Sequence, residues 1–102
     1  MKRGEVWWAH VDKRRPVVLV SRDEAYAVRA LLIVAPVTVT SRGFAAEVRV
    51  GRREGLPRPC VVNCDSMVTI PKADLVERAG ALSEAKVHEL DEALRFALGL
   101  EG

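Results

Sequence analysis

The sequence contains few of the residues that bind metal ions or form disulfides. Its 102 residues include two cysteines and two histidines, with no HExxH motif, no paired CxxC motif and no evident cage of carboxylates. Cys60 and Cys64 lie in an extended, β-branched run, where residues four apart are separated by roughly 13 Å, beyond the roughly 7 Å between α-carbons that a disulfide tolerates. We interpret both cysteines as small apolar core residues, with a reactive thiol or a metal pair as the less favoured alternative. We expect no metal or other cofactor.

Long hydrophobic runs and glycine-rich loops are also absent. No apolar run reaches the roughly 18 residues that a membrane-spanning helix needs, and no apolar segment of secretory length follows the charged start Met1–Glu5. The seven glycines are dispersed, which argues against a glycine-rich phosphate-binding loop. We therefore expect a cytoplasmic protein without a membrane segment.

The composition is that of one globular domain, which we expect to span residues 1–102. Apolar residues make up 49% of the chain and charged residues 29%, enough for one modest hydrophobic core. The formal net charge is only +2, so any attraction to nucleic acid would depend on where the cations lie. Positive residues cluster at positions 13–15 and at 52–53, whereas acidic residues gather near the C-terminus.

The first 71 residues are predicted to form β-strands. Leu31–Ala35 is a nearly continuous apolar run, typical of a strand buried on both faces, and Pro36 within that strand suggests a bulge or an edge. Many short strands joined by tight turns favour a closed or nearly closed barrel. The predicted strands are Glu5–Val11, Val17–Ser21 opened by Pro16, Leu31–Thr40, Ala46–Val50, and Cys60–Ile70 with a bend near Asn63–Ser66.

The chain after residue 71 is predicted to be helical. Lys72–Glu77 is expected to form a short turn of helix, and Ser83 is placed to cap a longer helix that Gly99 would end. Apolar residues recur through this helix at helical spacing, and we expect them to pack on the barrel; a partner-binding face is the alternative. This apolar stripe consists of Val87, Leu90, Leu94, Ala97 and Leu98.

Arg15 is the candidate functional residue that stands out most clearly. It precedes Pro16 at the mouth of a predicted strand, and the next long strand offers the hydroxyl of Thr38. RNA carries its own nucleophile, the ribose 2′-hydroxyl, so a metal-free nuclease needs only to orient it, stabilise charge on the phosphate and assist proton transfer. A well-placed arginine donor contributes on the order of 3–4 kcal/mol to such stabilisation. No general base is evident, and a solvated loop cation and an ordinary strand threonine stay open as alternatives.

The two adjacent tryptophans should point to opposite faces of their strand. One of Trp7 and Trp8 is therefore expected in the core, while the other could stack on a base. We assign the stacking role to Trp8.

Several short motifs occur together in a characteristic order. The motifs are Arg3-Gly4-Glu5-Val6-Trp7, Arg15-Pro16-Val17-Val18-Leu19-Val20, Val34-Ala35-Pro36-Val37-Thr38, Ser41-Arg42-Gly43-Phe44 before Glu47-Val48, Gly55-Leu56, and Cys60-Val61-Val62-Asn63-Cys64-Asp65-Ser66. By these motifs the chain resembles the MazF/PemK family of toxin endoribonucleases over nearly its full length.

The resemblance implies a mainly β (α+β), MazF/CcdB-like fold: a small SH3-like β-barrel with a C-terminal α-helix, assembled as a homodimer. It implies a type II toxin that cleaves single-stranded RNA at a short sequence without metal, leaving 2′,3′-cyclic phosphate and 5′-hydroxyl ends, and a cognate antitoxin that covers the RNA groove. Arg15 and Thr38 match the family's catalytic arginine and threonine. The residues expected to bind RNA are Lys13, Arg14, Ser41 and Arg42, together with Trp8.

Two segments depart from the family pattern. The connection Asp12–Arg15 is much shorter than usual, and the stretch that commonly reads Asp-Gln-Ile-Arg-Thr reads Asp65-Ser66-Met67-Val68-Thr69. Two alternatives stay open: a non-catalytic toxin of the same fold that binds a protein target such as DNA gyrase, and a family member that has lost activity through its shortened loop.

Overall fold

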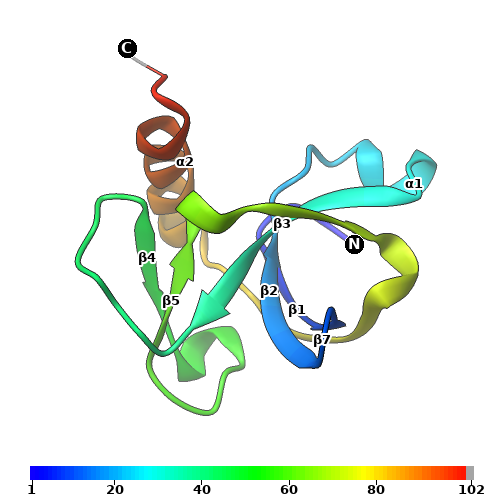
Figure 1. Cartoon of the computed structure of the whole chain (residues 1–102), viewed down its shortest axis with the longest axis horizontal. Helices are drawn as coiled ribbons and strands as arrows, with labels where there is room; N and C mark the ends of the chain where they lie inside the picture. Colours follow the sequence, from blue (N-terminus) through cyan, green and yellow to red (C-terminus); the bar gives the residue numbers. More distant parts are fainter. Residues whose placement is uncertain (101–102) are drawn as a thin grey trace.

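The computed structural model describes residues 1–100 and consists of a curled antiparallel sheet with one long C-terminal helix (Figure 1). In chain order the elements are β1 (Glu5–His10), β2 (Arg14–Leu19), α1 (Ala25–Val28), β3 (Leu31–Thr38), β4 (Glu47–Val50), η1 (Arg52–Glu54), β5 (Cys60–Asn63), η2 (Cys64–Ser66), β6 (Val68–Pro71), η3 (Lys72–Asp74), β7 (Leu75–Ala81) and α2 (Glu84–Leu98).

The sheet is organised around β3, the longest strand. The strand order is β4-β5-β3-β2-β1-β7, and β6 pairs with the first half of β3. β6 and β5 thus occupy successive stretches of the same edge of β3, with the η2 turn between them, and the sheet curls into a half-barrel (Figure 1). The predicted mainly β fold with a C-terminal helix is confirmed.

Both faces of the sheet are buried over much of its area because neighbouring strand residues point to opposite sides. Val6 of β1 belongs to a core cluster completed by Leu90 and Leu94 of α2, whereas Ala9 belongs to a second cluster that includes Tyr26 of α1. As the alternation predicted, the tryptophans lie on opposite faces, but both are half-buried: Trp8 packs on the first cluster and Trp7 on the second. The expectation that only one of them would pack in the core was wrong. The two tryptophans therefore serve different cores.

Pro36 lies within β3 without a bulge. The backbone N–H and C=O of Ile33 both form hydrogen bonds on the β2 side of the strand. Successive residues of an antiparallel strand direct these groups to alternate edges, so the backbone nitrogen of Pro36, three residues later, faces the edge opposite β2. On that edge Pro36 falls between Val34, which pairs with β6, and Val37, which pairs with β5. Its missing N–H therefore coincides with the gap between two neighbouring strands.

Three predictions about the strands were wrong in detail. β2 begins at Arg14, so Pro16 is not its first residue. β3 is half-exposed at its start, where Leu31 and Ile33 are 53% and 43% exposed, rather than buried on both faces. The segment 75–81 is a strand, β7, and not part of a helical region; it pairs with the free edge of β1, a tertiary contact that its own charged sequence does not reveal.

The C-terminal helix follows the prediction closely. Ser83 accepts a hydrogen bond from the Lys86 N–H at 3.2 Å, and Gly99 takes a left-handed conformation at the helix end. The predicted stripe packs on the core except for Leu98, which is 58% exposed, while Ala93, which was not predicted, is buried.

The two cysteines are free thiols. Cys64 is buried, in the η2 turn rather than in a strand, and burial raises the pKa of its thiol to about 11. This agrees with a core role for Cys64; Cys60 is only partly buried.

Candidate functional site

The strand register brings Arg15 and Thr38 together on one face of the sheet. β2 and β3 are antiparallel, with Val17 opposite Pro36. Arg15 precedes Val17 by two residues in β2, and Thr38 follows Pro36 by two residues in β3. Because residues two apart on a strand share a face, both side chains lie on the same sheet face, each two residues beyond the last paired position of the two strands.

An acidic residue that sequence reasoning missed holds the Arg15 guanidinium. Its Nε donates to Asp12 Oδ1 at 3.0 Å and its Nη2 to Asp12 Oδ2 at 3.4 Å, the fork geometry that arginine also uses with phosphate. The Arg15 hydrogen bond lowers the pKa of the Asp12 carboxyl to about 2, and the carboxylate raises the pKa of Arg15. The side chains of Asp12 and Arg15 are 70% and 47% exposed, so a second anion has access to the guanidinium.

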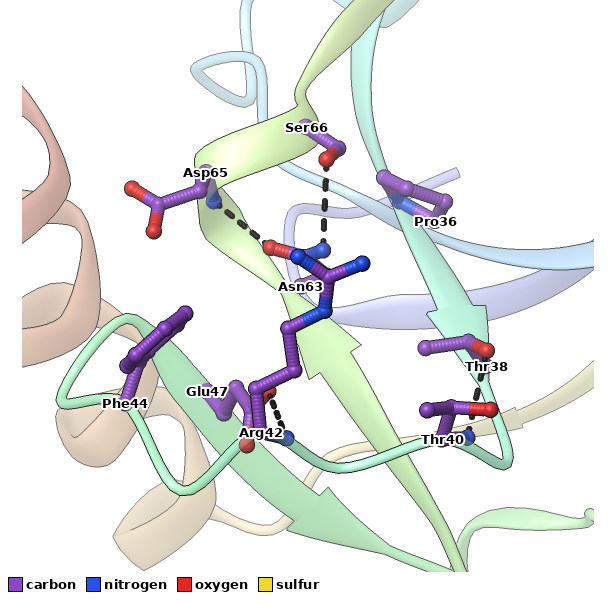
Figure 2. Close-up of a pocket in the computed structure, with 9 residues that line it drawn as sticks. All are labelled: Pro36, Thr38, Thr40, Arg42, Phe44, Glu47, Asn63, Asp65 and Ser66. Atoms are coloured by element: carbon purple, nitrogen blue, oxygen red, sulfur yellow. Dashed lines mark hydrogen bonds between the residues drawn. The ribbon is translucent and has the colours of Figure 1, made fainter.

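A pocket of about 450 Å³ opens beside Thr38 (Figure 2). It lies over the end of β3, the end of β5 and the start of β4, and combines hydroxyl, amide, carboxylate and guanidinium groups with one exposed aromatic ring, Phe44. Arg42 extends into it from the loop between β3 and β4 (Figure 2). The lining residues are Pro36, Thr38, Thr40, Arg42, Phe44, Glu47, Asn63, Asp65 and Ser66.

The loop that carries Arg42 is tied to Glu47, the first residue of β4. Glu47 accepts hydrogen bonds from the Ser41 hydroxyl at 2.8 Å, the Arg42 N–H at 2.9 Å and the Gly43 N–H at 3.2 Å. The Arg42 N–H and then the Ser41 hydroxyl hold the pKa of this carboxyl below its usual value. The sequence showed Glu47 only as an outward residue of an alternating strand, and nothing in that pattern indicated its loop contacts.

The opposite wall of the pocket is a compact turn at η2. Asn63 accepts a hydrogen bond from the Asp65 N–H at 2.9 Å and donates one to the Ser66 hydroxyl at 3.2 Å (Figure 2). These contacts fix the segment in which the sequence departs from the family pattern, and they place Asp65 and Ser66 at the pocket.

Trp8 and Arg14 lie on the other face of the sheet from Arg15. The Arg14 guanidinium sits over the Trp8 ring, 5.1 Å from its centroid, and pairs with the carboxylate of Glu77. Trp8 also packs on the core cluster that includes residues of α2, and it is half-buried. Lys13 is exposed in the short connection before β2.

The predicted residues thus fall into separate groups. Thr38 and Arg42 line the pocket of about 450 Å³, which we call the main pocket. Ser41 lines a second pocket of about 260 Å³ together with Arg49 and Cys60. Among residues 1–100, no three or more His, Cys, Asp or Glu side chains gather where they could hold a metal ion, and no helix is long and apolar enough to cross a membrane.

A curled antiparallel sheet with one C-terminal helix is the fold expected from the sequence resemblance, and comparison with known proteins supports that fold. Residues 2–98 match the family described as "PemK-like, MazF-like toxin of type II toxin-antitoxin system". The chain is 40% identical over 99 residues to the probable endoribonuclease MazF5 of Mycobacterium tuberculosis, covering 94% of this chain and 91% of that protein.

Solved structures agree. The Mycobacterium tuberculosis toxin MazF-mt6 superposes with a TM-score of 0.92 at 38% identity, covering 96% of this chain and 99% of that one. A mycobacterial endoribonuclease in complex with its cognate antitoxin superposes with a TM-score of 0.90 at 26% identity, covering 100% of this chain and 98% of that one.

The chain belongs to the PemK/MazF family of toxins of type II toxin–antitoxin systems. The resemblance predicted from the ordered motifs is confirmed. Because the relatives are named endoribonucleases, the comparisons favour the nuclease prediction over the gyrase-binding alternative.

Proposed function

We propose that the protein is a metal-independent, sequence-specific endoribonuclease that cleaves single-stranded RNA and thereby inhibits translation. The observation that supports the proposal is that Arg15 of β2 and Thr38 of β3 lie on the same sheet face of two adjacent strands, with Thr38 also lining the main pocket. The names of the relatives support the same activity.

In the proposed reaction the ribose 2′-oxygen attacks the adjacent phosphorus and the 5′-oxygen of the next nucleotide leaves. The 2′-hydroxyl loses its proton and the leaving oxygen gains one, so the products are a 2′,3′-cyclic phosphate and a 5′-hydroxyl. Arg15 stabilises the charge that builds on the phosphate oxygens. The Thr38 hydroxyl, which accepts a hydrogen bond from the Thr40 N–H at 3.3 Å, keeps its own hydrogen to donate to the phosphate or the 2′-oxygen.

RNA would take the place of Asp12 on Arg15. An exposed ion pair is worth only about 0.2–1 kcal/mol, so a phosphate bound through several contacts outcompetes it. While it is paired with Arg15, Asp12 is a poor general base, since a carboxyl with a pKa of about 2 accepts a proton weakly at neutral pH.

The remaining predicted residues would bind the flanking RNA. Lys13, exposed before β2, and Arg42, which lines the main pocket, would supply positive charge to the flanking phosphates, and Ser41 lines the second pocket. Arg14 must leave the face of Trp8 before a base can stack there, so Arg14 and Trp8 act on RNA only after that pair opens.

The assembly is proposed from the family. We propose a cytoplasmic homodimer of one-domain subunits that binds a cognate antitoxin, which covers the RNA groove and blocks cleavage. The mycobacterial relative solved with its antitoxin supports the antitoxin partner.

The proposal is tested by incubating the purified protein with one long transcript of mixed sequence in EDTA and mapping the fragment ends. Discrete fragments with cyclic phosphate and 5′-hydroxyl ends are expected. Intact RNA would contradict the proposal, and stalled topoisomerase complexes in a parallel gyrase assay would favour the gyrase-binding alternative.

A further inference from the structure

The loop between β3 and β4 has little structure of its own. Residues 40–44 belong to no helix or strand, and they are exposed. Yet this loop carries Arg42, a cation that lines the main pocket. A cation on an unsupported loop would lose conformational freedom on binding RNA, and the free-energy cost of that lost entropy would weaken the binding.

Glu47 supplies the support that the loop lacks. Its carboxylate accepts hydrogen bonds from three consecutive residues: Oε1 accepts from the Ser41 hydroxyl and the Gly43 N–H, and Oε2 accepts from the Arg42 N–H. Figure 2 shows the bond from Arg42 to Glu47. Glu47 itself is fixed by its strand, since it pairs with Asn63 of β5. The carboxylate therefore joins an irregular loop to a paired strand.

We propose that Glu47 is a positioning residue for RNA binding: it locks the Ser41–Gly43 turn so that the Arg42 guanidinium is held in the main pocket for a phosphate of the bound RNA. This inference rests on the proposed endoribonuclease function. Glu47 accepts bonds from backbone and hydroxyl donors and leaves the guanidinium of Arg42 free for the phosphate, because no ion pair between these two side chains occurs in the described part of the chain.

The chemistry requires a carboxylate at position 47. Both oxygens accept hydrogen bonds, whereas a glutamine offers one oxygen and one NH₂ group. In Glu47→Gln the NH₂ must face at least one of the three donors, so at least one bond is lost. Glu47→Asp keeps the charge but is one methylene shorter, so it gives a second variant with a weaker expected effect.

The test measures single-turnover RNA cleavage by the whole protein in EDTA, giving the half-saturating protein concentration and the rate at saturation. Glu47→Gln is expected to raise the half-saturating concentration by about tenfold, as for loss of a contact with a charged group, with the saturated rate changed less than about twofold. The slope of log affinity against log salt concentration should decrease by the amount expected for the loss of about one phosphate contact. Glu24→Gln, which removes the same charge before α1, is the matched control and should leave both quantities unchanged.

A double-mutant cycle with Arg42→Ala separates positioning from a merely structural role. If Glu47 acts through Arg42, Glu47→Gln has no further effect on RNA affinity in the Arg42→Ala background. Amide hydrogen exchange at Arg42 and Gly43 should quicken severalfold in Glu47→Gln, while the melting temperature reports whether the variant is folded. Additive effects, or an unchanged half-saturating concentration in both Glu47 variants, would overturn the inference. Failure of the wild-type protein to cleave RNA would instead contradict the proposed function.

Discussion

Arg15 is an exposed cation whose partner in the free protein is a carboxylate on the same short connection. Asp12 holds both arms of the guanidinium fork that the proposed reaction needs for phosphate. The carboxylate therefore keeps Arg15 in a defined orientation and also competes with RNA. The larger of these two effects, orientation or competition, decides whether removal of the Asp12 charge raises or lowers KM for RNA.

Replacing Asp12 by asparagine is expected to lower KM for RNA about twofold to fivefold. The reason is that an exposed ion pair contributes no more than about 1 kcal/mol, and its removal frees Arg15 for phosphate without loss of fold. The measurement is steady-state cleavage of a short RNA, with Glu24→Gln as the control for charge. A higher KM in Asp12→Asn would mean that orienting Arg15 matters more than competing with RNA.

The candidate site could be predicted from the sequence only in part. Arg15 and Thr38 stand in short motifs, so each was found locally. Asp12 and Glu47 were missed because their roles depend on side-chain contacts within loops, which leave no periodic pattern. Trp8 was found, but its contact with Arg14 could not be predicted before the pairing of β1 and β2 was known.

At the scale of elements, a helix or strand was predicted correctly where its own sequence carries the signal for it. The helix α2 is specified by its own cap residues Ser83 and Gly99 and by its apolar stripe, and its two ends fall where those residues predicted them. β7 was missed because its pairing with β1 is a contact between distant segments, and because Glu77 and Arg78 in its middle are exposed charges that suit a helix equally well.

β7 also forms a close backbone contact that predicts a large loss of stability. Gly55 has φ of 88°, and a Cβ there would lie 2.0 Å from the carbonyl oxygen of Ala79 in β7. Gly55→Ala should therefore lower the free energy of unfolding by more than about 2 kcal/mol, because strain and overlap add.

Gly99 is the matched control for this substitution. Its φ is 69°, but a Cβ at this position would meet no atom within 4 Å, so Gly99→Ala should cost only the left-handed strain of about 1 kcal/mol. Urea denaturation followed by circular dichroism measures both variants. Equal losses for the Gly55 and Gly99 variants would contradict the close packing of β7 against the η1 turn.

At the scale of the whole molecule, the half-barrel leaves apolar side chains in water. Leu31 and Ile33 lie on one face of β3 at 53% and 43% exposure. A homodimer, proposed from the family, gives such side chains a partner surface. Sedimentation equilibrium should therefore give twice the 11.2 kDa mass of the chain. A monomer at micromolar concentration would contradict the dimer.

The fold as a whole brings two separate segments, the start of β2 and the end of β3, to one sheet face, and the end of β3 also lines the main pocket. That convergence is the central claim, and Arg15→Ala tests it most directly. In EDTA, with a transcript that the wild-type protein cleaves, the variant should lose at least about 100-fold in cleavage rate, as expected for removal of a principal charge-stabilising donor. The melting temperature of the variant and the mass of its assembly in solution should match those of the wild-type protein. Cleavage by Arg15→Ala at a rate near that of the wild-type protein would contradict the account.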